Sequence, residues 1–194
     1  MSSFIDIAKL LVSKQLRFNK GEILLFNQPS GIIPIDWMVE LQKELYKRNE
    51  QNIIYYAGKE MGLRYFRNMY NLFKLSQEDI VNYGLGILTL AGWGDIKATV
   101  VDFENKIIIE QIKGGGPEAK MLGYTGKPVC HFIRGCAGGG ARAIFGEDSD
   151  AIETKCVSEG TTYCEFMKQP TRKWNKKDPL VKEQLALPKV KTMS

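Results

Sequence analysis

The four cysteines of this 194-residue chain all lie between residues 130 and 164. They are Cys130, Cys136, Cys156 and Cys164. No Cys-x-x-Cys pair occurs, so the spacing favours neither a zinc ribbon nor a thioredoxin-type redox pair. Cys156 and Cys164 flank Gly160 almost symmetrically, and a hairpin that turns there would place them opposite each other or nearly so. Two thiols so placed form a disulfide or share a metal ion, and the reducing cytosol disfavours the disulfide.

Zinc is the metal that these residues favour over the alternative of unrelated buried thiols. Zinc takes four ligands in a tetrahedron, with Zn–S distances of about 2.3 Å, and accepts a carboxylate among thiolates. The nearest carboxylates belong to Glu153, Glu159 and Glu165, and spacing alone does not select one. His131, the only histidine, is a further alternative. Glu153 and Cys156 are three residues apart, so we expect a twist or bulge between them if both bind one ion.

The composition is ordinary for a soluble globular protein, with 44% hydrophobic and 25% charged residues. No apolar run approaches the ~20 residues that span a bilayer. The first residues lack the pattern of a signal peptide, so we expect a cytoplasmic protein without a transmembrane segment. The net charge of +5 arises in residues 170–194, since residues 1–169 carry equal numbers of basic and acidic side chains. We therefore expect no nucleic acid ligand, and we interpret the basic tail as a solvated segment or as a docking element for a protein partner.

Hydrophobic periodicity and turn residues predict an α+β fold, in which N-terminal helices pack on an antiparallel sheet and one helix is inserted before the last hairpin. Asp36 and Ser76 are the expected N-caps of two helices, the second through a capping box with Asp79. The expected helices are residues 4–18, a helix after Asp36, residues 52–74, residues 76–91 and residues 129–145. The expected hairpins are residues 21–35 with a turn at 27–30, residues 96–111 and residues 150–167.

An apolar pocket is expected between the helices and the sheet. The aromatic-rich segment 52–74 can supply one wall, the alternative being that its side chains form ordinary core. The run of glycines at 138–140 costs about 1 kcal/mol for each residue relative to alanine in a helix. A chain that keeps such a run uses it for close backbone approach to another helix or to a ligand. The candidate pocket residues are Tyr65, Phe66, Met69, Phe73, Trp93 and Gly139.

The motifs of the C-terminal half resemble those of the 4-vinyl reductase, or hydrocarbon-binding, domain family. That family includes the sensor domains of phenol-responsive transcription activators and is related to Bet3-type subunits of vesicle-tethering complexes. The similarity implies a ligand-binding domain at residues 21–169, between an N-terminal extension, 1–20, and a basic C-terminal tail, 170–194. The motifs are Lys127-Pro-Val-Cys130, Gly135-x-x-x-Gly139, Phe145-Gly146, Glu153-x-x-Cys156, Gly160 and Cys164-x-Phe166, with Gly92-Trp-Gly94 before the first central strand.

The resemblance also implies a zinc site. In the aromatic sensors a Cys, a Glu and two more Cys hold the ion, and the intervals agree with Cys130, Glu153, Cys156 and Cys164 here. Cys136 has no place in that set, and we interpret it as a buried thiol. The resemblance further implies a homodimer, because both related groups pair through their helices.

The resemblance implies a ligand pocket, but not the phenol site of the sensors. The His and Trp that grip phenol there correspond to Val81 and Ile109 here, so we expect a more apolar ligand such as a lipid, an isoprenoid or a tetrapyrrole-like molecule. We expect no catalysis by the chain alone, because no dinucleotide fingerprint is present and a four-ligand zinc has no open position. The predicted function is a zinc-stapled ligand-binding or sensory domain. The alternatives are an adaptor or scaffold subunit of the Bet3 type and an accessory subunit of a vinyl reductase.

Overall fold

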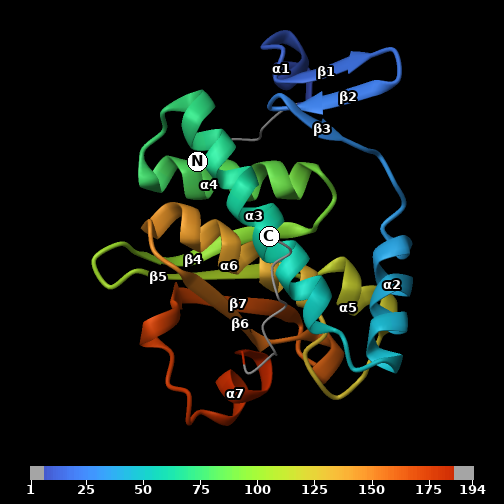
Figure 1. The fold of residues 1–194 in the computed structure, drawn as a ribbon, viewed down its shortest axis with the longest axis vertical. Coiled ribbons are helices and arrows are strands. Elements are labelled where there is room, and N and C mark those ends of the chain that lie inside the picture. The colour runs from blue at the N-terminus through green and yellow to red at the C-terminus, as the bar shows by residue number, and fades with distance from the viewer. Residues whose placement is uncertain (1–6, 186–194) are drawn as a thin grey trace, which may run out of the picture.

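The computed structural model describes residues 7–185 and shows helices packed on a four-stranded antiparallel sheet (Figure 1). The strand order is β4-β5-β7-β6. The predicted α+β class is therefore confirmed. Within residues 7–185 no helix has both the length and the apolar character needed to cross a lipid bilayer. The four strands are β4 (Asp95–Asp102), β5 (Ile107–Lys113), β6 (Ser149–Lys155) and β7 (Tyr163–Pro170).

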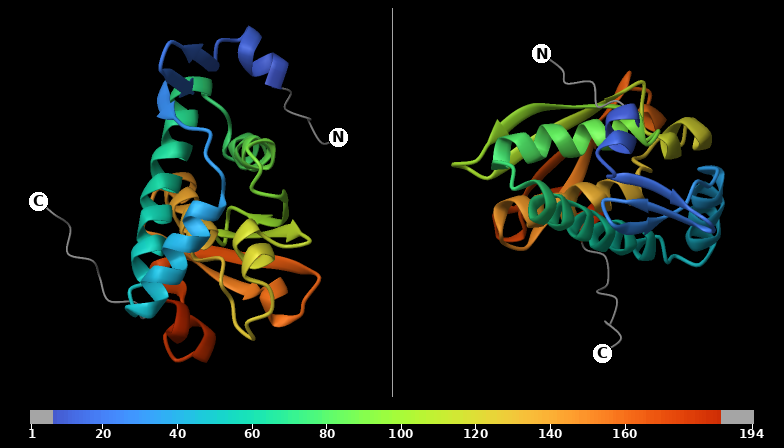
Figure 2. Two further views of the ribbon diagram at one scale, coloured as in Figure 1. Left: turned by 90° about the vertical axis from the view of Figure 1, so that its right-hand side faces the viewer. Right: turned by 90° about the horizontal axis from the view of Figure 1, so that it is seen from above.

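Two helices cross at glycines to form the centre of the molecule. Helix α6 (His131–Phe145) lies between the sheet and the long helix α3 (Asn52–Phe73), as the views of Figure 2 show. The contact uses two pairs of glycines, each pair four residues apart and so on one helix face. A Cβ atom at any of these four positions would overlap backbone atoms of the facing helix. The glycines are Gly58 and Gly62 on α3 and Gly135 and Gly139 on α6.

The N-terminal region forms a second, three-stranded sheet where a helix and a simple hairpin were predicted. Helix α1 (Ile7–Val12) ends before β1 (Leu16–Asn19), so the predicted helix at 4–18 is wrong beyond Val12, and residues 4–6 lie outside the described part of the chain. Residues 16–19 alternate in polarity, and pairing with β2 (Glu22–Leu25) outweighs their weak helical pattern.

The turn predicted at residues 27–30 is also wrong, because Gln28–Ser30 is strand β3 and pairs with β2. The turn lies instead at Phe26 and Asn27, which have φ of 52° and 63°. Two successive positive φ angles are what a type I′ hairpin turn requires. Residues 31–34, expected to form the second arm of the hairpin, belong to no strand.

An aromatic cluster anchors this small sheet to the helices. Phe26 is buried and its ring meets that of Phe73 edge-on, with the centroids 5.4 Å apart. Tyr65 and Tyr83 complete the cluster, at 6.2 Å and 6.3 Å from the Phe26 ring. The side-chain amide of Asn68 also donates a hydrogen bond to the Phe26 carbonyl oxygen. The small sheet is therefore held at its β2–β3 turn.

The predicted helix caps have different outcomes. Helix α4 (Gln77–Leu90) begins as expected, because the Ser76 hydroxyl accepts a hydrogen bond of 3.1 Å from the backbone N–H of Asp79. Helix α2 (Asp36–Lys47) begins at Asp36 itself, with Ile35 as an N-cap that makes no side-chain hydrogen bond. Asp36 is therefore a first-turn residue, where its charge favours the positive end of the helix dipole.

The C-terminal helix α7 (Pro179–Leu185) covers the edge strand β6. Val181 packs with Ile152 and Trp174 in a small apolar cluster. The buried side chain of Gln184 pairs with the backbone of Glu153: its Oε1 accepts the N–H at 2.8 Å, and its Nε2 donates to the carbonyl at 2.8 Å. The domain boundaries predicted at residues 20 and 170 thus fall within packed structure, since β1 also pairs with β2 across the first.

Candidate metal centre and ligand cavities

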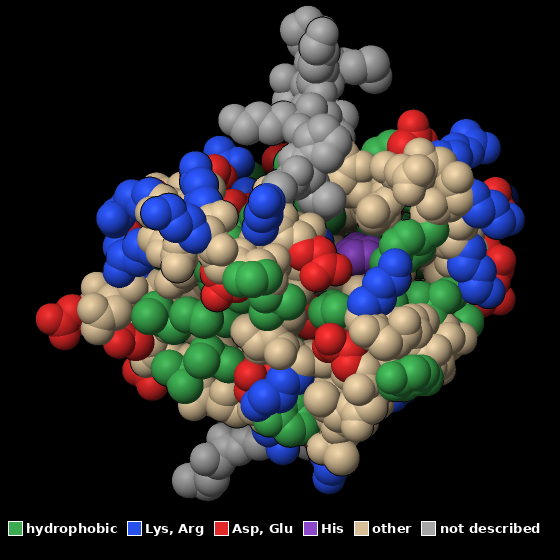
Figure 3. Space-filling view, turned by 90° about the horizontal axis from the view of Figure 1, so that it is seen from below, with side chains coloured by type: hydrophobic (Ala, Val, Ile, Leu, Met, Phe, Trp, Pro, Cys, Tyr) green, Lys and Arg blue, Asp and Glu red, His purple; other side chains and the backbone are tan. Residues whose placement is uncertain are grey.

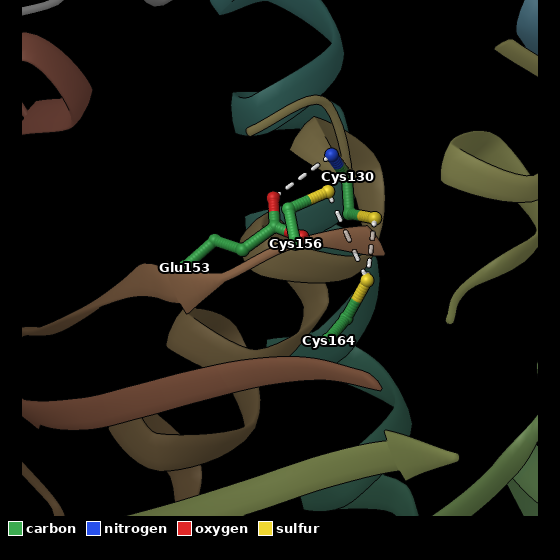
Figure 4. Close-up of side chains that lie close together, drawn as sticks. All are labelled: Cys130, Glu153, Cys156 and Cys164. Carbon is green, nitrogen blue, oxygen red and sulfur yellow. Dashed lines mark hydrogen bonds between the residues drawn. The ribbon is translucent and has the colours of Figure 1, made fainter. Parts of the chain in front are cut away.

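Three cysteines and one glutamate converge beneath the start of α6 (Figure 4). Cys130 immediately precedes α6, Glu153 lies in β6, Cys156 follows β6, and Cys164 lies in β7. The three Sγ atoms and one carboxylate oxygen all lie within 4.8 Å of one another, and all four residues are buried. The structure thus brings together the four residues that the sequence resemblance selected. We call them the four-residue cluster.

The separations within the four-residue cluster fit a shared ion. The Sγ atom of Cys164 lies 3.8 Å from that of Cys130 and 3.8 Å from that of Cys156. A tetrahedron with Zn–S distances of about 2.3 Å has an edge of about 3.8 Å. A disulfide needs an S–S distance of about 2.05 Å, and all four cysteines are free thiols. The sulfur positions therefore match metal ligation rather than a disulfide.

The irregularity predicted between Glu153 and Cys156 is present. The pairing of β6 with β7 shifts register between Glu153 and Lys155. Cys156 then lies beyond the end of β6, at the start of a short 3-10 helix, Val157–Glu159. It therefore approaches Cys164 from the loop and not across a regular ladder. The bulge is what allows Glu153 and Cys156 to reach the same point.

The carboxylate of Glu153 has an unused oxygen. Its Oε2 accepts a hydrogen bond of 3.0 Å from the backbone N–H of Cys130, whereas the buried Oε1 has no hydrogen-bond partner. A buried polar atom of this kind is costly unless something else binds it. A cation held by the three sulfurs would satisfy it, so this oxygen also fits a metal ligand.

Protonation differs among the residues of the metal-free cluster. Burial raises the pKa of the Cys130 thiol and that of the Glu153 carboxyl well above their usual values. Hydrogen bonds from the Cys130 and Cys156 thiols lower the pKa of Cys164 to about 4. Cys164 is thus a thiolate at neutral pH, while Cys130 and Glu153 hold protons that a divalent cation must displace.

The N-terminal end of α6 adds favourable electrostatics to the four-residue cluster. Free N–H groups and the helix dipole make this end attractive to anions. The N–H of Phe132 is accepted by Oε1 of Glu118, at 2.9 Å, from helix α5 (Pro117–Leu122). Burial, and then the charge of Glu153, raises the pKa of Glu118 to about 8, so Glu118 is mainly protonated at pH 7. Sequence analysis missed Glu118, because its spacing from the cysteines carries no ligand signal.

The alternative ligands have other partners. Glu165 accepts hydrogen bonds from the Gln111 side-chain amide at 2.7 Å and from the Thr154 hydroxyl at 2.9 Å. His131 interacts with the hydroxyl of Tyr46. Neither residue, nor Glu159, joins the four-residue cluster among the described residues. Cys136 lies further along α6 and lines a cavity instead.

An apolar groove of about 510 Å³ opens between the small sheet and the helices. We call it the outer groove. One wall comes from β1, β2 and residues 31–35, and the other from the end of α4 and from α3 and α6. Apart from Ser30 and Gly31, every lining residue is hydrophobic, and these include Phe18, Ile33, Trp37, Met61, Trp93 and Phe132.

A second, much smaller space of about 20 Å³, the inner cavity, lies between the helices and the sheet. Met61 and Trp93 line both spaces and so form the wall between them. The inner cavity is apolar except for Glu110 and Lys168, with Cys136 as a weakly polar member.

The predicted pocket residues divide between cavity walls and core. Phe66 and Trp93 line the inner cavity, and Trp93 also lines the outer groove. Met69 is fully buried in the main core. The other three line neither space: Tyr65 and Phe73 pack around Phe26, and Gly139 lies at the helix crossing.

Comparisons with known proteins place this fold and cluster in one class. Residues 114–170, which contain the whole four-residue cluster, match the family model of the vinyl-4-reductase domain. The predicted resemblance to the 4-vinyl reductase domain family is therefore confirmed. The chain is also 28% identical over 144 residues to an uncharacterized protein of Methanocaldococcus jannaschii, across 72% of this chain and 76% of that protein.

Two solved structures share the fold. The first is the phenol-responsive sensory domain of the transcription activator PoxR, solved with phenol. It superposes with a TM-score of 0.79 at 20% identity, over 97% of this chain and 100% of that one. The second is a vinyl-4-reductase family protein of Methanocaldococcus jannaschii, with a TM-score of 0.51 at 19% identity over 86% and 97% of the two chains. At these identities the likeness concerns the fold.

Proposed function

We propose that this chain is a zinc-stabilised domain that binds an apolar small molecule and does no chemistry on it. The outer groove is the observation that carries the proposal, because about 510 Å³ of almost wholly hydrophobic lining lies within the roughly 300–1,000 Å³ range of ligand sites. The match to the vinyl-4-reductase domain and the fold shared with a sensory domain solved with phenol support it.

Zinc would have a structural role in this function. Cys130, Glu153, Cys156 and Cys164 would supply four ligands, and such a closed site leaves no position for substrate or activated water. The four residues come from the start of α6, from β6 and from β7, so a shared ion ties the helix to two strands. Zinc would thereby fix the inner wall against which a ligand packs.

The surface supports a small-molecule ligand over a nucleic acid. On the face shown in Figure 3, acidic side chains lie among the Lys and Arg side chains. Nucleic acid binding needs a patch or stripe of one sign. The cytoplasmic location, the homodimer, the absence of catalysis, the protein partner of the basic tail and the Bet3-type adaptor alternative all stay predictions.

Titration with the neutral dye Nile red tests the binding function. The wild-type protein should bind the dye saturably in the outer groove. Phe18 and Ile33 line the groove and are 58% and 60% exposed, so replacing both with serine should leave the fold intact. If each loses about 1 kcal/mol of apolar contact, the affinity should fall by about 30-fold.

Tyr124→Ser is the matched control, since Tyr124 is 79% exposed and lies outside the groove. The proposal fails if the wild-type protein binds no dye saturably, or if the control weakens binding as much as the double variant.

Metal analysis of protein purified without chelator tests the zinc part separately. We expect about one zinc ion per chain, as the four ligand atoms imply, and none in Cys130→Ser or Cys164→Ser. Metal-free wild-type protein that keeps its full thermal stability would refute a structural zinc.

A further inference from the structure

A buried ion pair lies in the wall of the inner cavity. Lys168 on β7 and Glu110 on β5 occupy diagonal positions on one face of the sheet, since Glu110 pairs with Phe166 and Lys168 with Ile108. Their side chains are 2% and 5% exposed and form an ion pair. The remaining lining is apolar except for the weakly polar thiol of Cys136. Two charges are thus removed from water in a place where hydrophobic residues of similar size stabilise a fold at least as well.

The ammonium group of Lys168 has hydrogen-bonding capacity to spare. It carries three N–H donors. Among residues 7–185 its one partner is the Glu110 carboxylate. The unused donors belong to a side chain that lines the inner cavity, so a polar group placed in that cavity can reach them.

The size of the inner cavity limits that group. A volume of about 20 Å³ holds one water-sized group, since a water needs about 10–15 Å³ by the same measure. A hydroxyl group fits this space, whereas a larger head group does not.

The charge of the pair limits the group as well. Lys168 and Glu110 neutralise each other, so a carboxylate head would bring an unpaired charge into a buried site. A hydrocarbon end would leave the N–H donors unbonded. A hydroxyl can accept from the Lys168 ammonium and donate to the Glu110 carboxylate, so both its hydrogen-bonding functions are used.

The outer groove supplies the place for the rest of such a ligand. Met61 and Trp93 separate the groove from the inner cavity. Methionine is unbranched and adapts its side chain easily, so a narrow head group can pass beside Met61 without moving the helix. The groove beyond is hydrophobic and long enough to involve α1, β1, β2 and residues 31–35.

We propose that the Lys168–Glu110 pair recognises the hydroxyl head of a long-chain aliphatic alcohol whose chain lies in the outer groove. This inference rests on the proposed function, because it names the ligand class of the same groove. The carboxylate analogue of that alcohol is the ligand it excludes.

Three matched ligands test this on the unmodified protein: 1-dodecanol, its methyl ether and dodecanoate, each competing with Nile red. The alcohol should bind about tenfold more tightly than the ether, which cannot donate, and than dodecanoate, which is charged. Equal affinities would show that no head group reaches the inner cavity. Tighter binding of dodecanoate would show that the site is cationic. Either result overturns the inference while Nile red binding still upholds the proposed function.

A double variant gives a second test. Glu110→Leu with Lys168→Met removes both charges together, so no unpaired charge remains to unfold the protein. It should bind dodecanol about tenfold more weakly and the ether unchanged, with Nile red binding preserved. A dodecanol affinity equal to that of the wild type would refute the role of the pair.

Discussion

Replacing Gln184 with alanine should detach helix α7 from the strand that carries Glu153. The glutamine side chain is 5% exposed and forms both available hydrogen bonds with the Glu153 backbone, each of 2.8 Å. In the variant, a buried N–H and a buried carbonyl of β6 lose their partners. Each unsatisfied group costs about 1–3 kcal/mol, with the lower part of that range applying where water can enter an edge strand.

We therefore expect a loss of about 3 kcal/mol in the free energy of unfolding for Gln184→Ala, taking about 1.5 kcal/mol for each orphaned group. For a chain of this size each kcal/mol lowers Tm by about 2–4 °C, so Tm should fall by about 9 °C. Thermal unfolding of the zinc-saturated protein, followed by near-UV circular dichroism, measures this shift.

Glu183→Ala is the control, because Glu183 is the exposed neighbour on the same helix and its loss should cost less than about 0.5 kcal/mol. Hydrogen exchange at the Glu153 amide gives an independent reading, since that N–H should exchange faster in Gln184→Ala alone. The reasoning is refuted if Gln184→Ala unfolds within about 1 °C of the control.

Three further changes test other parts of the structure. Gly62→Ala forces a methyl group onto the backbone of α6 and should cost about 3 kcal/mol or prevent folding, whereas Gly31→Ala, with no atom within 4 Å of its Cβ, should be nearly neutral in urea unfolding. Burial raises the pKa of Asp150, but Lys59 and hydroxyl donors outweigh it, so the net pKa lies below 3.8. Asp150→Asn should therefore lose about 3 kcal/mol at pH 7, and its stability should approach that of the wild type as the pH falls below about 3.8 and the carboxylate is protonated; equal stabilities at pH 7 would contradict this. Chelation with EDTA should lower Tm by more than about 10 °C, and zinc but not magnesium should restore it, because thiolates select zinc.

The parts of the fold that sequence predicted well depend on local signals. The periodicity of residues 52–74 and the Ser76 cap each act over a few residues, and both helices begin and end near the predicted positions. The bulge after Glu153 was predictable because the ligand spacing is incompatible with a regular strand. The family resemblance supplied the choice of Glu153 over Glu165, which local spacing could not make.

The errors occur where long-range packing decides the structure. Residues 16–19 become a strand because β2 and β3 are beside them, and the aromatic cluster at Phe26 fixes that sheet against α3. The outer groove joins residues distant in sequence, such as Phe18 and Phe132, so no local pattern reveals it. Glu118 was missed for the same reason, since it meets the start of α6 only in the folded chain.

The glycine crossing of α3 and α6 has a consequence for motion in the protein. Side chains between packed helices act as adjustable spacers that can change rotamer, but here backbone contacts backbone at Gly58, Gly62, Gly135 and Gly139. Such a joint has no intermediate positions, so the two helices move as one rigid body. Opening of the outer groove must then come from its other wall, the small sheet and residues 31–34, which no strand pairing restrains. The molecule thus consists of a stiff frame and a hinged cover, and ligand exchange should occur at the rate at which that cover opens.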